Sequence, residues 1–207
     1  MARIVVLGAG IGGMSAAYEL RGTLGQGPEI TVIGEGDRFS FTPSNPWVAV
    51  GWRKPSDVEM PVAHYLAKKN IAFEGVGAER IEPDHNRVRL RDGRTLDYDY
   101  LVIATGPRLA FDEVPGLGPE GGYTHSICTT PHATTAWQAY QAFLENPGPV
   151  VVGAAPMASC FGPAYEFAMI LDSDLRKRRL RDRVPITYVS PEPYVGHMGL
   201  GGVGDSK

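Results

Sequence analysis

The two cysteines of this 207-residue chain, Cys128 and Cys160, are the residues best suited to covalent or redox chemistry. Cys160 follows an apolar run at 150–152 and precedes a predicted helix, so it lies in a strand-to-helix turn. The electric field at a helix N-terminus favours the thiolate, which is the nucleophilic form of cysteine. We therefore predict a reactive thiol at Cys160; the alternative is a small buried hydrophobic residue.

Three side chains near these cysteines or near the end of the chain could transfer protons. Glu166 follows Cys160 in the predicted helix, where it is either a proton acceptor or only a carboxylate of the first turn. His132 and His197 are each as consistent with a structural role as with a catalytic one. No C-x-x-C pair occurs, so no metal site is predicted. The other three histidines are expected to be structural: His64, His85 and His125.

The N-terminal segment has the pattern of a dinucleotide-binding turn. Apolar residues 4–7 predict a buried strand, residues 14–20 predict a helix, and the glycines between them form G-x-G-x-x-G at Gly8, Gly10 and Gly13, with one more at Gly12. In this motif the first glycine permits the tight turn, the second lets the backbone approach a pyrophosphate, and the third lets the helix pack on the strand. The alternative is a purely structural glycine turn.

The second predicted strand, at 29–33, ends in Gly34 and Glu35. A carboxylate at this place binds the ribose hydroxyls in dinucleotide-binding folds, so we predict that contact for Glu35; an exposed loop acid is the alternative.

The loop that follows is aromatic and stiffened by proline, with Pro43, Ser44 and Asn45 at its centre. We predict that it forms one wall of a flavin pocket, and a packed surface loop is the alternative.

Residues 79–97 alternate polar and apolar side chains around an Asp-Gly turn, which predicts an antiparallel β-meander. A buried strand at 99–104 follows and ends at Thr105 and Gly106. The predicted fold is α/β: a Rossmann-like FAD-binding domain (1–110) with an inserted meander, a crossover and helix (111–148), and an incomplete second Rossmann-like unit (149–207). That unit has only two predicted strands, so we expect a truncated version of a longer protein.

The charge of the chain and the pattern of its apolar runs argue against nucleic-acid binding, a signal peptide and a membrane span. A net charge of −3 and a pI near 6.0 argue against nucleic-acid binding. The N-terminus runs directly into the first strand, so no signal peptide is expected, and no apolar run of 18 residues predicts a membrane span.

Four motifs together resemble the sulfide:quinone oxidoreductases, a family of flavoproteins with two dinucleotide-binding domains. The resemblance covers essentially the whole chain and corresponds to the N-terminal half of such enzymes. The motifs are Ser44–Trp47, Ser126–Thr129, Ala158–Glu166 and Gly202–Lys207.

The resemblance implies FAD, sulfide as the electron donor and a membrane quinone as the acceptor. It matches Cys160 to the redox cysteine beside the flavin, Cys128 to an accessory cysteine, and His132 and His197 to histidines on the sulfide side. It also implies peripheral membrane association through parts outside this chain, and it leaves a homo-oligomer open. The cofactor contacts expected are Gly8, Gly10, Gly12, Gly13, Gly34, Glu35, Pro43, Ser44, Asn45, Ala78, Thr105 and Gly106.

The chain also departs from the family, because the third cysteine that pairs with the flavin-proximal one is absent. We therefore expect this chain alone to be inactive. The alternatives are an NADH:quinone oxidoreductase, a flavocytochrome-type sulfide dehydrogenase and an inactive truncated flavin-binding module. The first would need a second G-x-G-x-x-G after residue 152, which the sequence lacks.

Overall fold

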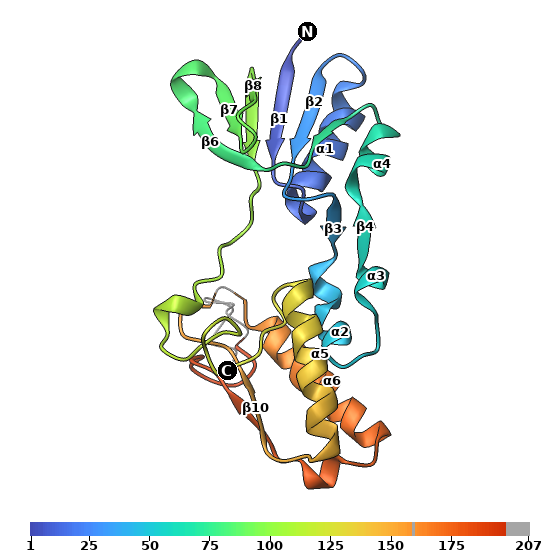
Figure 1. Cartoon of the computed structure of the whole chain (residues 1–207), viewed down its shortest axis with the longest axis vertical. Helices are drawn as coiled ribbons and strands as arrows, with labels where there is room; N and C mark the ends of the chain where they lie inside the picture. The colour runs from blue at the N-terminus through green and yellow to red at the C-terminus, as the bar shows by residue number, and fades with distance from the viewer. Residues whose placement is uncertain (159, 198–207) are drawn as a thin grey trace, which may run out of the picture. The chain divides into compact units, whose positions relative to one another are not determined.

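The computed structural model describes residues 1–158 and 160–197. The chain forms two compact units (Figure 1). Unit 1 contains Met1–Phe41 and Glu59–Leu109, and unit 2 contains Thr42–Val58 and the chain from Ala110 onward. Each unit therefore takes residues from two separate stretches of sequence.

Unit 1 is built on a parallel sheet with the strand order β5-β2-β1-β9. Continuous apolar runs form its central strands because both faces of a parallel sheet are covered. Leu7, at the end of β1, pairs with Ile33 of β2 on one side and with Ile103 of β9 on the other. The strands are β1 (Arg3–Leu7), β2 (Glu29–Ile33), β5 (Ala72–Glu74) and β9 (Tyr100–Ile103).

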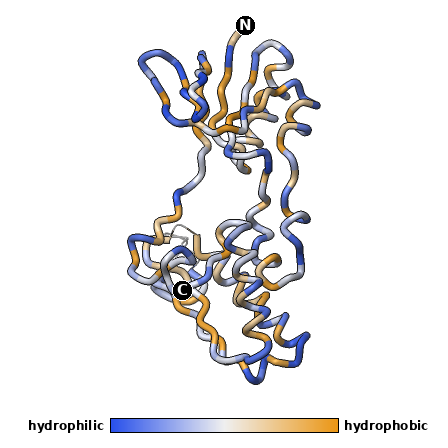
Figure 2. The backbone as a smooth tube through the Cα atoms, in the orientation of Figure 1, coloured by the Kyte–Doolittle hydropathy of each residue, from blue (hydrophilic) through white to orange (hydrophobic). Residues whose placement is uncertain are grey.

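Two helices and a meander pack around this sheet in unit 1. Helices α1 (Ile11–Leu24) and α4 (Val62–Ala67) enclose a core that includes Val6, Ala17 and Leu66. The meander consists of β6 (Ala78–Glu82), β7 (Arg87–Leu90) and β8 (Thr95–Asp97), and packs on the sheet through Val88 and Leu90. Its turns are hydrophilic, whereas the sheet strands are mainly hydrophobic (Figure 2). The predicted Rossmann-like core with an inserted antiparallel meander is confirmed.

The remaining elements of unit 1 are short. Strand β3 (Arg38–Ser40) pairs antiparallel with β4 (Glu59–Pro61), and η2 (Pro83–His85) connects β6 to β7.

Unit 2 packs two long helices against a two-stranded parallel sheet. Strand β10 (Val150–Gly153) pairs with β11 (Ile186–Val189), and α5 (Thr130–Glu145) and α6 (Gly162–Lys177) share a core with β10 through Tyr140, Val152 and Leu171. The two strands confirm the expected partial second Rossmann-like unit. Its short elements are η1 (Thr42–Ser44), α2 (Asn45–Ala49), α3 (Pro55–Val58), η3 (Phe111–Glu113) and η4 (Arg181–Arg183).

A buried carboxylate joins three segments of unit 2. Asp174, of which 3% is exposed, accepts hydrogen bonds from Trp52 Nε1 at 2.7 Å, from the Tyr140 hydroxyl at 2.8 Å and from Arg178 Nε at 2.6 Å. Burial, and next the bond to Asp174, raises the pKa of Tyr140 well above its ordinary value. The segment 42–58 therefore belongs structurally with α5 and α6 and not with the strands that flank it in the sequence.

Among the described residues, no helix has both the length and the apolar character needed to cross a bilayer. Asp172 pairs with Arg176, in the last turn of α6, and with Arg181, which follows the helix.

Candidate functional site

The turn after β1 has the backbone that the glycine pattern predicted. Gly8 adopts φ +115°, and a Cβ there would lie 2.1 Å from the carbonyl oxygen of Ala104. At Gly13 a Cβ would lie 1.8 Å from the Gly8 carbonyl oxygen, so helix α1 approaches the turn too closely for any side chain. A Cβ at Gly10 would meet nothing within 4 Å. The protein itself thus requires glycine at the first and third positions, whereas open space adjoins the second.

The N-terminus of α1 opens onto this space. The first helical hydrogen bond runs from Met14 N to Gly10 O at 2.9 Å, which leaves the N–H groups of Ile11, Gly12 and Gly13 without acceptors inside the helix. No side chain caps this end, and the first turn carries no acidic residue. Free N–H groups at a helix N-terminus bind phosphate, so these residues fit the pyrophosphate of a dinucleotide.

The ends of three parallel strands bring the other predicted contacts to the same edge of the sheet. Gly8 N donates to Ile33 O at 2.8 Å and Ala104 N donates to Leu7 O at 2.7 Å, so the turns after β1, β2 and β9 adjoin. Thr105 and Gly106 are exposed directly after β9. Ligands bind at this carboxyl edge in open α/β sheets. Ala78 is the first residue of β6 and is half-buried.

Glu35 lies two residues after the end of β2, and 68% of its side chain is exposed. It forms a bridge with Val76, and its carboxylate pairs with Arg91 from the turn of the meander. A Cβ on Gly34 would lie 2.7 Å from Ala9 Cβ, so glycine is needed before the carboxylate. Sequence reasoning missed Arg91; its position beside the Asp-Gly turn was the available signal.

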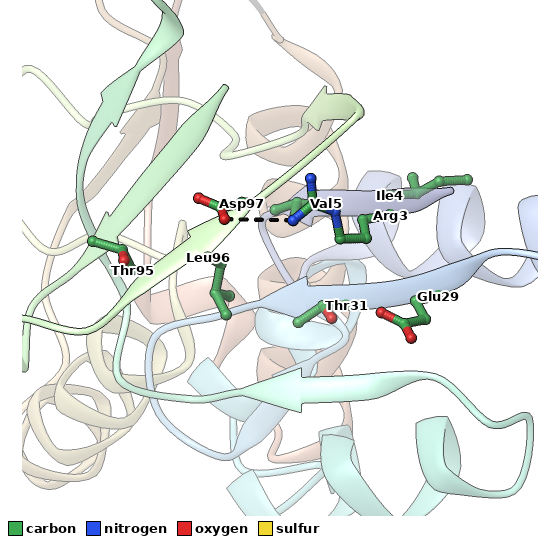
Figure 3. A pocket seen from close by; sticks show the side chains of 8 residues that line it. All are labelled: Arg3, Ile4, Val5, Glu29, Thr31, Thr95, Leu96 and Asp97. Atoms are coloured by element: carbon green, nitrogen blue, oxygen red, sulfur yellow. Dashed lines mark hydrogen bonds and ion pairs between the residues drawn. The ribbon is translucent and has the colours of Figure 1, made fainter. Parts of the chain in front are cut away.

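Unit 1 contains a hollow at the amino edge of the same sheet. It has a volume of about 200 Å³ and is lined by side chains from β1, β2 and β8. Figure 3 shows Arg3 facing Asp97 there, with an ion pair of 3.4 Å between them. No predicted cofactor residue lines it, so this hollow lies away from the glycine turn.

The proline-stiffened loop folds with unit 2. Asn45 is fully buried and Ser44 is 8% exposed, while Pro43 is exposed. Asn45 Oδ1 accepts a hydrogen bond from Thr130 Oγ1 at 3.2 Å, and its Nδ2 has no partner among the described residues. The structure therefore places these three residues in a different unit from the glycine turn, and their contact with a cofactor stays a prediction.

Cys160 is exposed and lies two residues before α6. The loop from β10 to α6 is longer than a direct strand-to-helix turn, and Ser159 lies outside the described residues. Glu166 is exposed and is the fifth residue of α6. The first turn carries no acid, so the alternative that Glu166 is a first-turn carboxylate is wrong.

Cys128, in the loop before α5, and His132, in the first turn of α5, share Ser126 as a hydrogen-bonding partner. Cys128 is exposed, and its N–H donates to Ser126 Oγ at 3.1 Å. The same hydroxyl lies 3.3 Å from His132 Nδ1, and Glu120 Oε1 lies 3.4 Å from His132 Nε2. Sequence reasoning did not identify Ser126 or Glu120 as partners of this histidine.

His197 is the last described residue. Its segment is attached to α6, because Gly196 N donates to the Tyr165 hydroxyl at 2.8 Å and that hydroxyl donates to Glu192 at 2.7 Å. Both cysteines are free thiols, and no cluster of potential metal ligands occurs among residues 1–158 and 160–197. The structure thus joins Cys128 to His132, and records no such link between Cys160 and Glu166 within the described part.

Comparison with known proteins identifies relatives along nearly the whole chain. The sequence model of the pyridine nucleotide-disulphide oxidoreductases matches residues 2–197. The sulfide-quinone reductase of Aquifex aeolicus is 48% identical over 206 residues, which are 99% of this chain and 46% of the relative. The mitochondrial sulfide:quinone oxidoreductase of Dictyostelium discoideum is 27% identical over 91% of this chain and 42% of its own length.

A solved structure agrees with these matches. The X-ray structure of the sulfide:quinone oxidoreductase from Aquifex aeolicus superposes with a TM-score of 0.91 at 47% identity, covering 99% of this chain and 46% of that one. The chain thus spans about half the length of the relatives that it matches.

Proposed function

Because the chain belongs to the pyridine nucleotide-disulphide oxidoreductase family, we propose that the whole protein oxidises sulfide with FAD and passes the electrons to a membrane quinone. The observation that carries this proposal is the 48% identity over 99% of the chain to a sulfide-quinone reductase. An exposed cysteine in the loop before α6, where a nicotinamide-binding member would carry a second glycine motif, supports it.

The cofactor is held first by unit 1. Gly8 to Gly13 and the free N–H groups of α1 receive the pyrophosphate, and Glu35 receives the ribose hydroxyls. Thr105, Gly106 and Ala78 adjoin the same edge. FAD supplies the two-electron acceptor that sulfur oxidation requires. The proposal also includes the predicted contacts of Pro43, Ser44 and Asn45 with the cofactor.

The thiols and proton-transfer groups lie in unit 2. Cys160 would carry the sulfur as a persulfide: one S–S bond forms between its thiolate and the hydrogen sulfide ion, one proton is released, and FAD would accept the two electrons. Cys128 assists as a second exposed thiol. Hydrogen sulfide ion loses one proton and two electrons when its sulfur reaches the oxidation level of elemental sulfur. Glu166, His132 and His197 accept or relay that proton. The products are polysulfide or sulfur and a quinol.

The remaining parts of the proposal concern partners. The protein associates peripherally with the membrane, where its quinone resides, and it can assemble with further copies of itself. The negative net charge argues against a role in nucleic-acid binding.

Anaerobic addition of sulfide to the purified whole protein tests the proposal. Sulfide should bleach the visible absorbance of the bound flavin, and NADH should not. The variant Cys160→Ser should retain FAD and lose the bleaching, whereas Cys128→Ser should slow it. Bleaching by NADH but not by sulfide would refute the proposal, and purification without flavin would favour an inactive module.

A further inference from the structure

The His132 ring in unit 2 contacts two oxygen-containing side chains, Ser126 and Glu120. The ring is mostly buried, with 14% of its side chain exposed, and it lies against Phe111 with ring centres 5.7 Å apart. Both contacts to its nitrogens are long, at 3.3 and 3.4 Å, which is near the upper limit for a hydrogen bond. The chemistry of the two partners determines where the ring carries its proton.

Glu120 faces Nε2. An ionised carboxylate has acceptors only, so Nε2 must carry the hydrogen of this contact. Glu120 is 81% exposed, which places the outer end of the contact in water.

The Ser126 hydroxyl faces Nδ1, and 9% of the surface of this residue is exposed. The oxygen already accepts the Cys128 N–H at 3.1 Å, and its own hydrogen is free to point at Nδ1. In the neutral ring Nδ1 is then the acceptor. The same hydroxyl therefore shapes the backbone of the loop that presents the Cys128 thiol and holds the histidine ring.

We propose that Ser126 and Glu120 are positioning residues that keep the neutral His132 ring in the Nε2–H tautomer and tie it to the Cys128 loop. A proton released near Cys128 is taken up at Nδ1, and a different proton leaves from Nε2 to Glu120 and the solvent. Atoms and charge balance, since one proton enters the ring and one leaves. The use of this path in sulfide oxidation rests on the proposed function; the tautomer does not.

Ring-nitrogen NMR shifts of the 207-residue chain, with nitrogen-15 in its histidines, test the assignment directly. The wild-type ring should be mainly Nε2–H at a pH where it is neutral. Glu120→Ala should raise the Nδ1–H fraction about threefold or more, because the acceptor at Nε2 is lost. Glu113→Ala is the matched control, since Glu113 is exposed in the same loop and carries the same charge. A ring mainly in the Nδ1–H form, or equal tautomer fractions in both variants, would overturn the assignment.

The second arm uses the whole protein and sulfide. Ser126→Ala should slow sulfide-driven bleaching about tenfold, and Ser126→Thr should restore it because it keeps a hydroxyl. Equal rates for Ser126→Ala and wild type would overturn the role in the reaction. If wild-type flavin is not bleached by sulfide at all, the proposed function fails, whereas the NMR result still decides the tautomer.

Discussion

Asp174 provides the sharpest test of how unit 2 is assembled. The substitution Asp174→Asn keeps the size of the side chain but replaces one acceptor oxygen by an NH₂ group. Oδ1 accepts from Trp52, and Oδ2 accepts from Tyr140 and Arg178. In either orientation of the amide, the NH₂ group faces an N–H donor, Trp52 Nε1 or Arg178 Nε, and the hydrogen bond to that donor is lost.

The magnitude follows from burial. A buried polar group left unpaired costs about 1–3 kcal/mol, and loss of a hydrogen bond to a charged group costs about 1.5–3 kcal/mol. Arg178 is 39% exposed and can recover part of its loss in water. We expect Asp174→Asn to lower the free energy of unfolding of unit 2 by about 3 kcal/mol, and Asp174→Ala by about 3–5 kcal/mol.

Urea denaturation followed by tryptophan emission measures this loss in unit 2 alone. All three tryptophans of the chain, Trp47, Trp52 and Trp137, belong to that unit. Asp172→Asn is the matched control, because Asp172 lies on the same helix and pairs with arginines but is 31% exposed. Its cost should stay below about 1 kcal/mol. Equal costs for Asp172→Asn and Asp174→Asn would refute the argument that burial decides the energy.

Four further predictions concern the cofactor site and the contribution of Tyr188 to stability. Gly10→Ala should leave the stability of the apoprotein unchanged and weaken FAD binding by at least about tenfold, or about 1.4 kcal/mol, in a flavin-fluorescence titration. Unchanged FAD affinity in this variant would contradict the site. Gly8→Ala should instead prevent folding, because its Cβ would collide with the Ala104 carbonyl. Arg91→Met should weaken FAD binding only a few-fold, because the pair with Glu35 is more than half exposed, and a loss beyond about 1 kcal/mol would show that Arg91 contacts the cofactor itself. Burial raises the pKa of Tyr188 to about 12, so the folded state disfavours ionisation of its hydroxyl. The free energy of unfolding should therefore be constant below about pH 10 and fall between about pH 10 and 12. When unfolding is measured across that range, Tyr188→Phe should show a smaller fall. Since the Tyr188 hydroxyl has no hydrogen-bond partner among the described residues, Tyr188→Phe should be neutral or stabilising at pH 7, and a clear loss there would show a hidden partner.

Local patterns predicted much of unit 1. The apolar run at β1, the spacing of the glycines and the Asp-Gly turn of the meander each act within a few residues, through backbone sterics and side-chain periodicity. The position of Cys160 between β10 and α6 was also predicted, although the intervening loop is longer than the pattern indicated.

Contacts between distant segments were not predictable. Arg91 reaches Glu35 across 56 positions, and Trp52 reaches Asp174 across 122. The segment 42–58 follows the second nucleotide-binding strand in the sequence, so sequence reasoning assigned it to the cofactor domain. Its apolar side chains, among them Val48 and Val50, instead find their burial against α5 and α6.

Local sterics and periodicity in the sequence account for the helices, strands and turns that form and for the residue types that are available for chemistry. Which of those residues meet depends on tertiary packing. It joined Ser126 to both Cys128 and His132, and it placed Pro43, Ser44 and Asn45 in unit 2. The physical reason is that burial of apolar surface has no direction along the chain, so it selects partners by complementary packing and not by distance in sequence.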